Sequence, residues 1–115
     1  MKLLDIWINC PDRETAAAIA EALVERRLAA CANIYPEIES IYRWKGNVER
    51  AREVPLLVKT RPAFFAAVES VARAMHPDET PAIHGVEAAA VTEDYLAWAH
   101  SETATPGGET RNDAS

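Results

Sequence analysis

One short loop of the sequence combines residue types that could bind a metal ion. His76, Asp78 and Glu79 lie close together in the run HPDETP. An imidazole ring and two carboxylates are ligands that divalent transition metals accept in proteins. A simpler interpretation is also open, because a histidine followed by Pro77 can end a helix and exposed acidic side chains are usually only solvated.

A second group of residues could line a ligand-binding cleft. Its members are aromatic side chains with a few charged ones: Tyr42, Trp44, Glu49, Lys59, Tyr95 and Trp98. Aromatic walls with a small number of charged groups are typical of small-molecule sites. Aromatic side chains are also enriched where subunits meet, so Trp44 and Trp98 could instead form the core of an interface, and Lys59 could be a surface ion-pair partner.

Charge and motif content exclude two broad classes of function. The chain has 115 residues, a net charge of −6 at pH 7 and a pI near 5.0, and its Lys and Arg residues are scattered. Nucleic-acid binding relies on a basic surface that this pattern lacks. The sequence also contains no GxSxG, HExxH or glycine-rich phosphate-binding motif. We therefore expect neither a nucleic-acid partner nor an enzyme.

The N-terminal segment and the cysteines favour a cytoplasmic protein. Asp5 interrupts the first apolar run, which has none of the usual features of a secretory signal. No apolar stretch approaches the length that spans a bilayer, so no membrane partner is expected. Cys10 and Cys31 do not form a CxxC pair and are expected to stay reduced.

The spacing of apolar residues predicts a mixed α+β domain. The expected elements are, in order, a strand over 4–10, a helix over 13–28, a long strand over 31–44, a returning strand around 54–58, a helix over 62–75, a strand over 83–91 and a short helix after Thr92. Met75 is expected on the buried face of the second helix, and Thr92 is expected to cap the third. The polar residues 103–115 bury nothing in this prediction and form a disordered tail, which leaves residues 1–102 as one domain.

Four local signals set the boundaries of these elements. Asp12 is expected to cap the first helix, because its carboxylate can accept free backbone amides. The long strand is expected to bend at Pro36, and residues 45–47 (Lys-Gly-Asn) form the turn of a hairpin. Pro55 lies within the returning strand and cannot donate a ladder hydrogen bond, so we expect it at a sheet edge or a bulge.

The order of the elements is that of a ferredoxin-like, split βαβ domain with an added C-terminal helix. The hairpin is longer than such a subunit needs, since arms of roughly fourteen residues would extend about 45 Å at about 3.3 Å per residue. An overhanging hairpin with apolar residues indicates that another subunit covers it.

Six segments of the sequence resemble proteins of the CutA divalent-cation-tolerance family. They are CPDRETA at 10–16, LAACANI at 28–34, SIYRWKGNVE at 40–49, EVPLLVKT at 53–60, HPDETP at 76–81 and YLAW at 95–98. The segments occur in the family's order and together cover nearly all of residues 3–100. The resemblance implies a ferredoxin-like subunit in a homotrimer, an architecture similar to the PII signalling proteins, and a non-enzymatic role in tolerance of copper and other divalent cations.

The resemblance also implies where a copper ion would bind. The family's described ligands, a first-strand cysteine and a His-His pair, align with Ile8, Met75 and His76, so one of them is retained. Cys10 lies on the same strand face as Ile8 and could substitute, which makes His76, Cys10, Asp78 and Glu79 the candidate metal ligands. No cofactor is required, but copper or another divalent cation could bind.

The sequence departs from the family at two further positions. Asp78 stands where an aromatic residue commonly follows His-Pro, and Ala82 stands where a glutamate commonly follows the next proline. A pocket between subunits would therefore differ in charge and shape. The alternative function implied by the PII-like architecture is a trimer that senses a small ligand in such a pocket.

Overall fold

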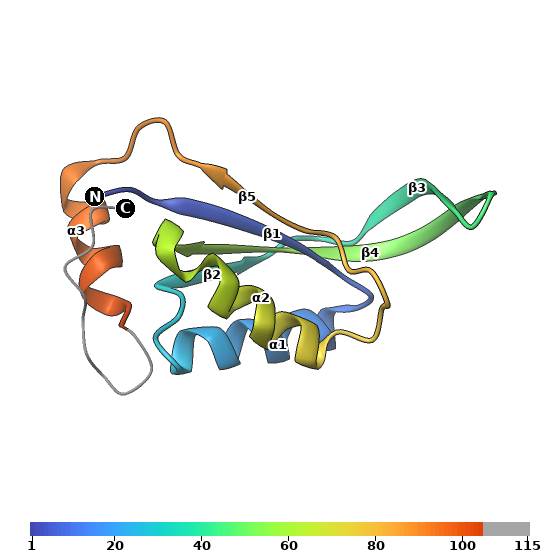
Figure 1. The fold of residues 1–115 in the computed structure, drawn as a ribbon, viewed down its shortest axis with the longest axis horizontal. Helices are drawn as coiled ribbons and strands as arrows, with labels where there is room; N and C mark the ends of the chain where they lie inside the picture. Colours follow the sequence, from blue (N-terminus) through green and yellow to red (C-terminus); the bar gives the residue numbers. More distant parts are fainter. Residues whose placement is uncertain (105–115) are drawn as a thin grey trace.

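The structure is a mixed α+β fold in which an antiparallel sheet is covered on one face by helices (Figure 1). The computed structural model describes residues 1–104 of the chain. Its elements are β1 (Leu4–Cys10), α1 (Arg13–Glu25), β2 (Cys31–Ile34), β3 (Ile38–Trp44), β4 (Asn47–Thr60), a 3₁₀ turn (Pro62–Phe64), α2 (Phe65–Met75), β5 (Ile83–Glu87) and α3 (Glu93–Glu102). The α+β class expected from the sequence is confirmed.

The core lies between the sheet and the helices α1 and α2, which pack side by side. The strand order is β2-β4-β1-β5, with β3 paired to the free half of β4. Alternate residues of β1 and β4 point toward the helices, as the two-residue period predicts. The largest fully buried apolar residues of these elements are Ile6, Ile8, Cys10, Leu56 and Val58 from the strands and Ile19, Leu23 and Val68 from the helices.

The hairpin projects beyond the sheet, as expected from the sequence, but its β3 arm has 7 residues and is therefore shorter than the predicted arms (Figure 1). β3 pairs with β4 from Trp44 opposite Asn47 to Ile38 opposite Glu53, and β1 joins β4 only at Val54. We call residues 38–53 the hairpin. Two residues with positive φ, Lys45 at 49° and Gly46 at 83°, form the turn. Positive φ at both central residues matches the twist of the flanking strands.

The predicted long strand over 31–44 is divided into β2 and β3, and the break explains the position of Pro55. Asn9 lies opposite Pro55, but its amide donates to Ala82 O (3.1 Å) and its carbonyl accepts from His76, so neither group faces β4. The backbone of Pro55 therefore faces the break, where its carbonyl accepts from Tyr35 N (2.9 Å). The prediction that Pro55 lies at a sheet edge or a bulge is wrong, because β4 as a whole is not an edge strand. Pro55 does face a local gap in strand pairing, which is where a residue without an amide hydrogen is tolerated.

Helix α1 ends three residues earlier than expected. Asp12 caps its start as expected, with Thr15 N donating to the carboxylate at 2.7 Å. At the other end, Arg27 takes a φ of 61°, and Leu28 N donates back to Leu23 O (2.9 Å). This is a Schellman motif, in which the residue with positive φ is usually glycine. Because that residue is Arg27 here, the sequence contains no signal for the end of the helix.

Three further expectations for the second half of the chain need correction. Met75, expected in the core, is 37% exposed because it is the last residue of α2. β5 ends at Glu87 rather than at Val91. Thr92 precedes α3 as expected, but its side chain makes no capping hydrogen bond.

A buried arginine holds the C-terminal end of α3. Arg61 is 1% exposed, and its guanidinium donates to His100 O (2.7 Å), Thr103 O (2.6 Å) and Thr103 Oγ1 (2.8 Å). A cation at this position complements the carbonyl groups that a helix C-terminus leaves without partners. Thr103 and Ala104 are buried, so the ordered domain continues past the predicted boundary at residue 102. The rest of the predicted tail, residues 105–115, lies outside the described residues.

None of the helices in residues 1–104 combines the length and apolar character that a membrane span requires.

We expect Thr103→Val to lower the free energy of unfolding by about 1–3 kcal/mol, because valine removes the buried hydroxyl that accepts from Arg61 Nε and donates to Ala99 O. Urea unfolding at a fixed protein concentration measures this change. Thr92→Val is the matched control, since the Thr92 side chain makes no cap hydrogen bond, and it should change stability by less than about 0.5 kcal/mol. Equal losses in both variants would contradict the role given to the Thr103 hydroxyl.

Candidate functional site

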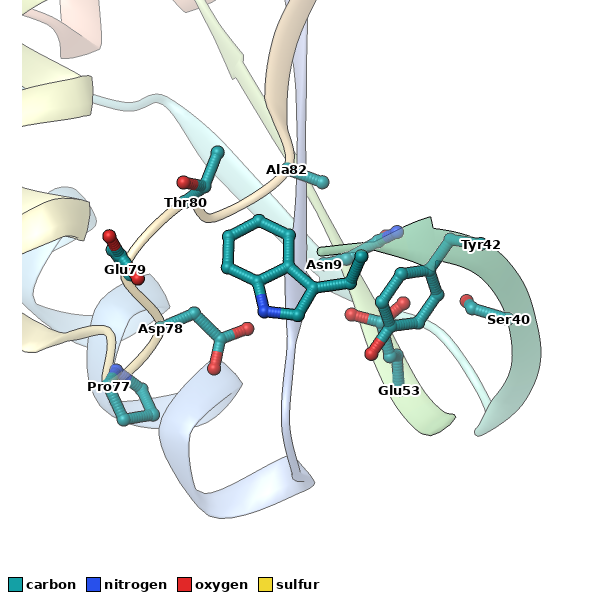
Figure 2. A pocket seen from close by; sticks show the side chains of 10 residues that line it. Asn9, Ser40, Tyr42, Glu53, Pro77, Asp78, Glu79, Thr80 and Ala82 are labelled. Atoms are coloured by element: carbon teal, nitrogen blue, oxygen red, sulfur yellow. The ribbon is translucent and has the colours of Figure 1, made fainter. Parts of the chain in front are cut away.

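A cavity of about 610 Å³ lies between the hairpin and the loop that connects α2 to β5 (Figure 2). We call it the hairpin cavity. It is open to solvent, and β1, β3, β4 and the loop all contribute to its walls. The residues that line it are Asn9, Ser40, Tyr42, Trp44, Glu53, Pro77, Asp78, Glu79, Thr80 and Ala82.

The regular spacing of β3 places its side chains in the hairpin cavity. Ser40, Tyr42 and Trp44 alternate along the strand and therefore point to the same face. Glu53 of β4 shares this face, because it lies opposite Ile38, two residues before Ser40. One wall of the cavity is therefore aromatic and carries one carboxylate.

His76 holds the opposite wall in place. Its ring is buried, and its Nδ1 accepts a hydrogen bond from Asp78 N (3.1 Å). The other ring nitrogen, Nε2, must then carry the proton and donates to Asn9 O (2.7 Å). His76 thus ties the start of the loop to β1, so that the following acidic residues lie at the cavity.

The two loop acids have different neighbours. The carboxylate of Asp78 lies 4.0 Å from His76 Nδ1, and that of Glu79 lies 4.0 Å from Lys45 Nζ at the hairpin turn. Asp78 is on the loop and Glu53 is on β4, on opposite sides of the cavity in Figure 2. The carboxylates therefore surround the cavity instead of meeting at one point.

The four candidate metal ligands do not form one ligand set in the structure. Cys10 is fully buried, and its Sγ lies 3.8 Å from Ile8 O. Burial raises the pKa of the Cys10 thiol to about 11, with a smaller contribution from nearby carboxylates, so the thiol is neutral near pH 7. Both ring nitrogens of His76 are already hydrogen-bonded. Within residues 1–104, no three His, Cys, Asp or Glu side chains come close enough to hold a metal ion.

The six residues predicted to line a ligand-binding cleft lie in two separate parts of the structure. Tyr42 and Trp44 line the hairpin cavity, and Glu49 lies opposite Tyr42 on β4 without lining it. The other three residues form a separate cluster near α3. There, Lys59 Nζ lies 5.7 Å from the ring centroid of Tyr95, and the rings of Tyr95 and Trp98 are 5.5 Å apart.

The environment of Tyr95 changes the pKa of its hydroxyl group. Burial raises the pKa of the Tyr95 phenol, and the nearby thiol of Cys31 adds to this shift, whereas the ammonium of Lys59 opposes it. Lys59 contacts the Tyr95 ring, and within residues 1–104 it forms none of the ion pairs considered from the sequence.

Sequence reasoning missed several residues that line the cavity. Asn9, Ser40 and Glu53 come from three strands, and Thr80 comes from the loop. The alternation of β3 could have placed Ser40 beside Tyr42 and Trp44. No local signal indicates that the loop after α2 approaches the hairpin, because this contact depends on the fold.

The fold and the cavity define a small α+β protein with an open cavity beside a projecting hairpin. A model of the family described as CutA1 divalent ion tolerance protein matches residues 4–102. The chain belongs to this CutA1 family, as its sequence motifs indicated.

Individual relatives agree with the family match. The divalent-cation tolerance protein CutA of Thermus thermophilus is 43% identical over 98 residues, which cover 85% of this chain and 95% of that protein. Mouse protein CutA is 38% identical, and the match covers 84% of this chain but 55% of the longer mouse protein. The solved Thermus thermophilus structure superposes with a TM-score of 0.86 at 41% identity, covering 89% of this chain and 99% of that one. An Arabidopsis thaliana relative, 32% identical over 85% of this chain and 54% of its own length, is described as chloroplastic.

We expect Cys10 to react with a thiol reagent near pH 8 far more slowly than Cys31. A pKa of about 11 leaves about one thiol in a thousand ionised at that pH, and the thiolate is the reactive form. Cys31→Ser and Cys10→Ala variants isolate the two thiols, and reaction with Ellman's reagent gives both rates. Rapid reaction of folded Cys31→Ser near pH 8 would contradict the raised pKa.

The same shift makes stability depend on alkaline pH. The folded-state pKa lies above the ordinary value of 9.0, so the stability contributed by the neutral Cys10 thiol is complete below pH 9 and is lost as the pH rises toward 11. Melting temperature should therefore fall more steeply over this range in wild type than in Cys10→Ala.

Proposed function

We propose that this chain serves divalent-cation tolerance as a homotrimeric, non-enzymatic protein that reversibly binds a small ligand in the hairpin cavity. The observation that carries the proposal is the meeting of two segments distant in sequence, β3 with its aromatic rings and the 77–82 loop with its carboxylates. A volume of about 610 Å³ lies within the range of small-molecule sites, and convergent polar groups beside aromatic walls are their usual lining.

The trimer is proposed from the exposed hairpin. Large apolar and aromatic side chains gather there with substantial exposure: Ile38 at 41%, Ile41 at 58%, Tyr42 at 44%, Trp44 at 39% and Val48 at 64%. By strand alternation Ile38, Tyr42 and Trp44 lie on the cavity face and Ile41 and Val48 on the opposite face, so both faces of the hairpin expose apolar side chains. Exposed apolar surface of this kind usually marks an interaction site. A second and third copy of a ferredoxin-like subunit, arranged as in PII-like trimers, would cover this surface. A neighbouring subunit would then also close the open side of the hairpin cavity.

We propose the cytoplasm as the compartment. Cys10 and Cys31 are both free thiols, which is the usual state of cysteines in a reducing compartment. No nucleic acid or membrane is proposed as a partner.

Metal binding is the second candidate function, and one contact favours it. Asp78 Oδ2 lies 4.0 Å from His76 Nδ1, so a small movement of the loop would let both bind copper or another divalent cation, with Glu79 or Cys10 as further ligands. This arrangement costs His76 its hydrogen bond from Asp78 N, and a set that includes Cys10 also requires that thiol to lose a tightly held proton. The structure therefore fits a metal set less well than it fits a larger ligand.

The trimer depends on the hairpin, so we expect Ile41→Lys to reduce the mass in solution from that of a trimer to that of a monomer. A lysine at this position places a charge in an apolar interface. Multi-angle light scattering measures the mass.

The control for this assembly experiment is Val24→Lys on α1, where the exposed fraction is similar at 42%, and it should remain trimeric. A monomeric wild-type protein would contradict the trimer itself. A trimer that survives Ile41→Lys would place the interface elsewhere.

Calorimetric titration with copper and zinc decides between the two candidate functions. We expect no saturable binding of one ion per subunit, because His76 is hydrogen-bonded at both nitrogens and Cys10 is protonated. His76→Ala and Asp78→Asn serve as companions to the wild type. Asp78→Asn is the sharper variant, since it removes a carboxylate but retains the backbone amide that binds His76. Saturable binding that both variants lose would overturn the first proposal in favour of a metal site.

A further inference from the structure

The hairpin cavity presents negative charge and aromatic surface to its ligand. Glu53, Asp78 and Glu79 contribute three carboxylates, and Tyr42 and Trp44 contribute two rings. Among the described residues that line the cavity there is no lysine or arginine. An anionic ligand would be repelled by this lining, whereas a cation would be attracted to both the carboxylates and the ring faces.

The spacing of the charges fits a cation larger than a metal ion. Asp78 lies on the loop with its carboxylate 4.0 Å from His76 Nδ1, and the carboxylate of Glu79 lies 4.0 Å from Lys45 Nζ of the hairpin turn. Glu53 lies across the cavity from Asp78, on β4 (Figure 2). Three carboxylates placed around about 610 Å³ cannot contact one ion at coordination distance, but they can contact separate parts of an organic molecule.

The chain itself places an alkylammonium group at the rim of the cavity. Lys45 Nζ lies 5.5 Å from the centroid of the Trp44 ring and 4.0 Å from the carboxylate of Glu79. The Lys45 side chain remains 72% exposed, so a competing cation could displace it at little cost.

The backbone of Lys45 is also unusual. Its φ of 49° lies in the left-handed region, where residues other than glycine, asparagine and aspartate are uncommon. The turn would be less strained with asparagine at this position. Strain at an exposed turn residue is one indication that its side chain has a role.

We infer that the hairpin cavity binds small organic cations with primary ammonium groups, and that Lys45 competes with them for Trp44 and Glu79. This inference rests on the proposed function and narrows its ligand to one chemical class. A diamine suits the lining best, because one ammonium group can reach Glu79 and Trp44 while the other approaches Glu53. Such binding is electrostatic in large part, so it should weaken as salt is added.

Three probes of similar length and different charge test the inference: cadaverine, pentanediol and glutarate. They carry two positive charges, none and two negative charges, respectively. Calorimetric titration of the assembled protein at low ionic strength should detect saturable binding of cadaverine alone. Raising the salt concentration should reduce this affinity several-fold.

Matched variants locate the site. Lys45→Asn removes the competing ammonium and suits the turn, so cadaverine should bind roughly three- to fivefold more tightly, whereas Lys45→Arg should leave the affinity near wild type. Glu53→Gln and Glu79→Gln should each weaken binding by about tenfold or less. Glu93→Gln, which removes an exposed carboxylate on α3, is the charge-matched control and should have no effect.

The possible outcomes distinguish a failure of this inference from a failure of the proposed ligand-binding function. Binding of pentanediol or glutarate that Trp44→Leu abolishes would overturn the inference and leave the ligand-binding function standing. Cadaverine binding that is equally strong in Glu53→Gln, Glu79→Gln and Glu93→Gln would also overturn it, because the attraction would then be to net charge only. No saturable binding of any probe, with Lys45→Asn equally inert, would count against both.

Discussion

The arrangement of this protein depends on the pairing of one long strand, β4, with three others. Its second half pairs with β1 on one side and β2 on the other, and its first half pairs with β3 alone. A strand in the middle of a sheet has its backbone groups satisfied on both sides and buries its inward side chains, as Leu56 and Val58 do. The same strand therefore builds the core at one end and the exposed hairpin at the other.

The pair formed by Asn9 of β1 and Pro55 of β4 connects this sheet to the candidate site. Since the backbone groups of Asn9 turn away from Pro55, they are free to accept from His76 and to donate to Ala82. The residues before and after the loop acids are thereby attached to β1. Pro55 faces the break between β2 and β3 on one side of β4, and on the other side Asn9 of β1 anchors the loop through His76. Together these features bring Asp78 and Glu79 to the cavity.

The chemistry of the cavity follows from which groups remain available after folding. His76 is committed to two hydrogen bonds, and the Cys10 thiol is buried and neutral, so both act as structural groups in this subunit. The carboxylates and the rings of Tyr42 and Trp44 stay exposed to the cavity. The proposed reversible binding of a positively charged molecule relies on this combination.

Local signals in the sequence were enough to predict most of the elements. The alternation in β1, the cap at Asp12 and the turn at Gly46 each depend on residues that are neighbours along the chain, and all three are found as expected. The family motifs were equally readable, and the family match confirms them. A structural feature could not be predicted where its usual residue is absent. Arg27 is the example, because it ends α1 in a conformation that glycine normally adopts.

The α+β class, the projecting hairpin, the family and, apart from the break within 31–44, the order of the elements could therefore be predicted from the sequence. The site depends on the tertiary structure, which joins Tyr42 and Trp44 to Asp78 and Glu79, places Lys59 and Tyr95 in a separate cluster and encloses Thr103. The physical reason is the range of the interactions. Periodicity and capping act over a few residues, whereas a cavity forms where strands and loops distant in sequence are brought together by backbone pairing and core packing.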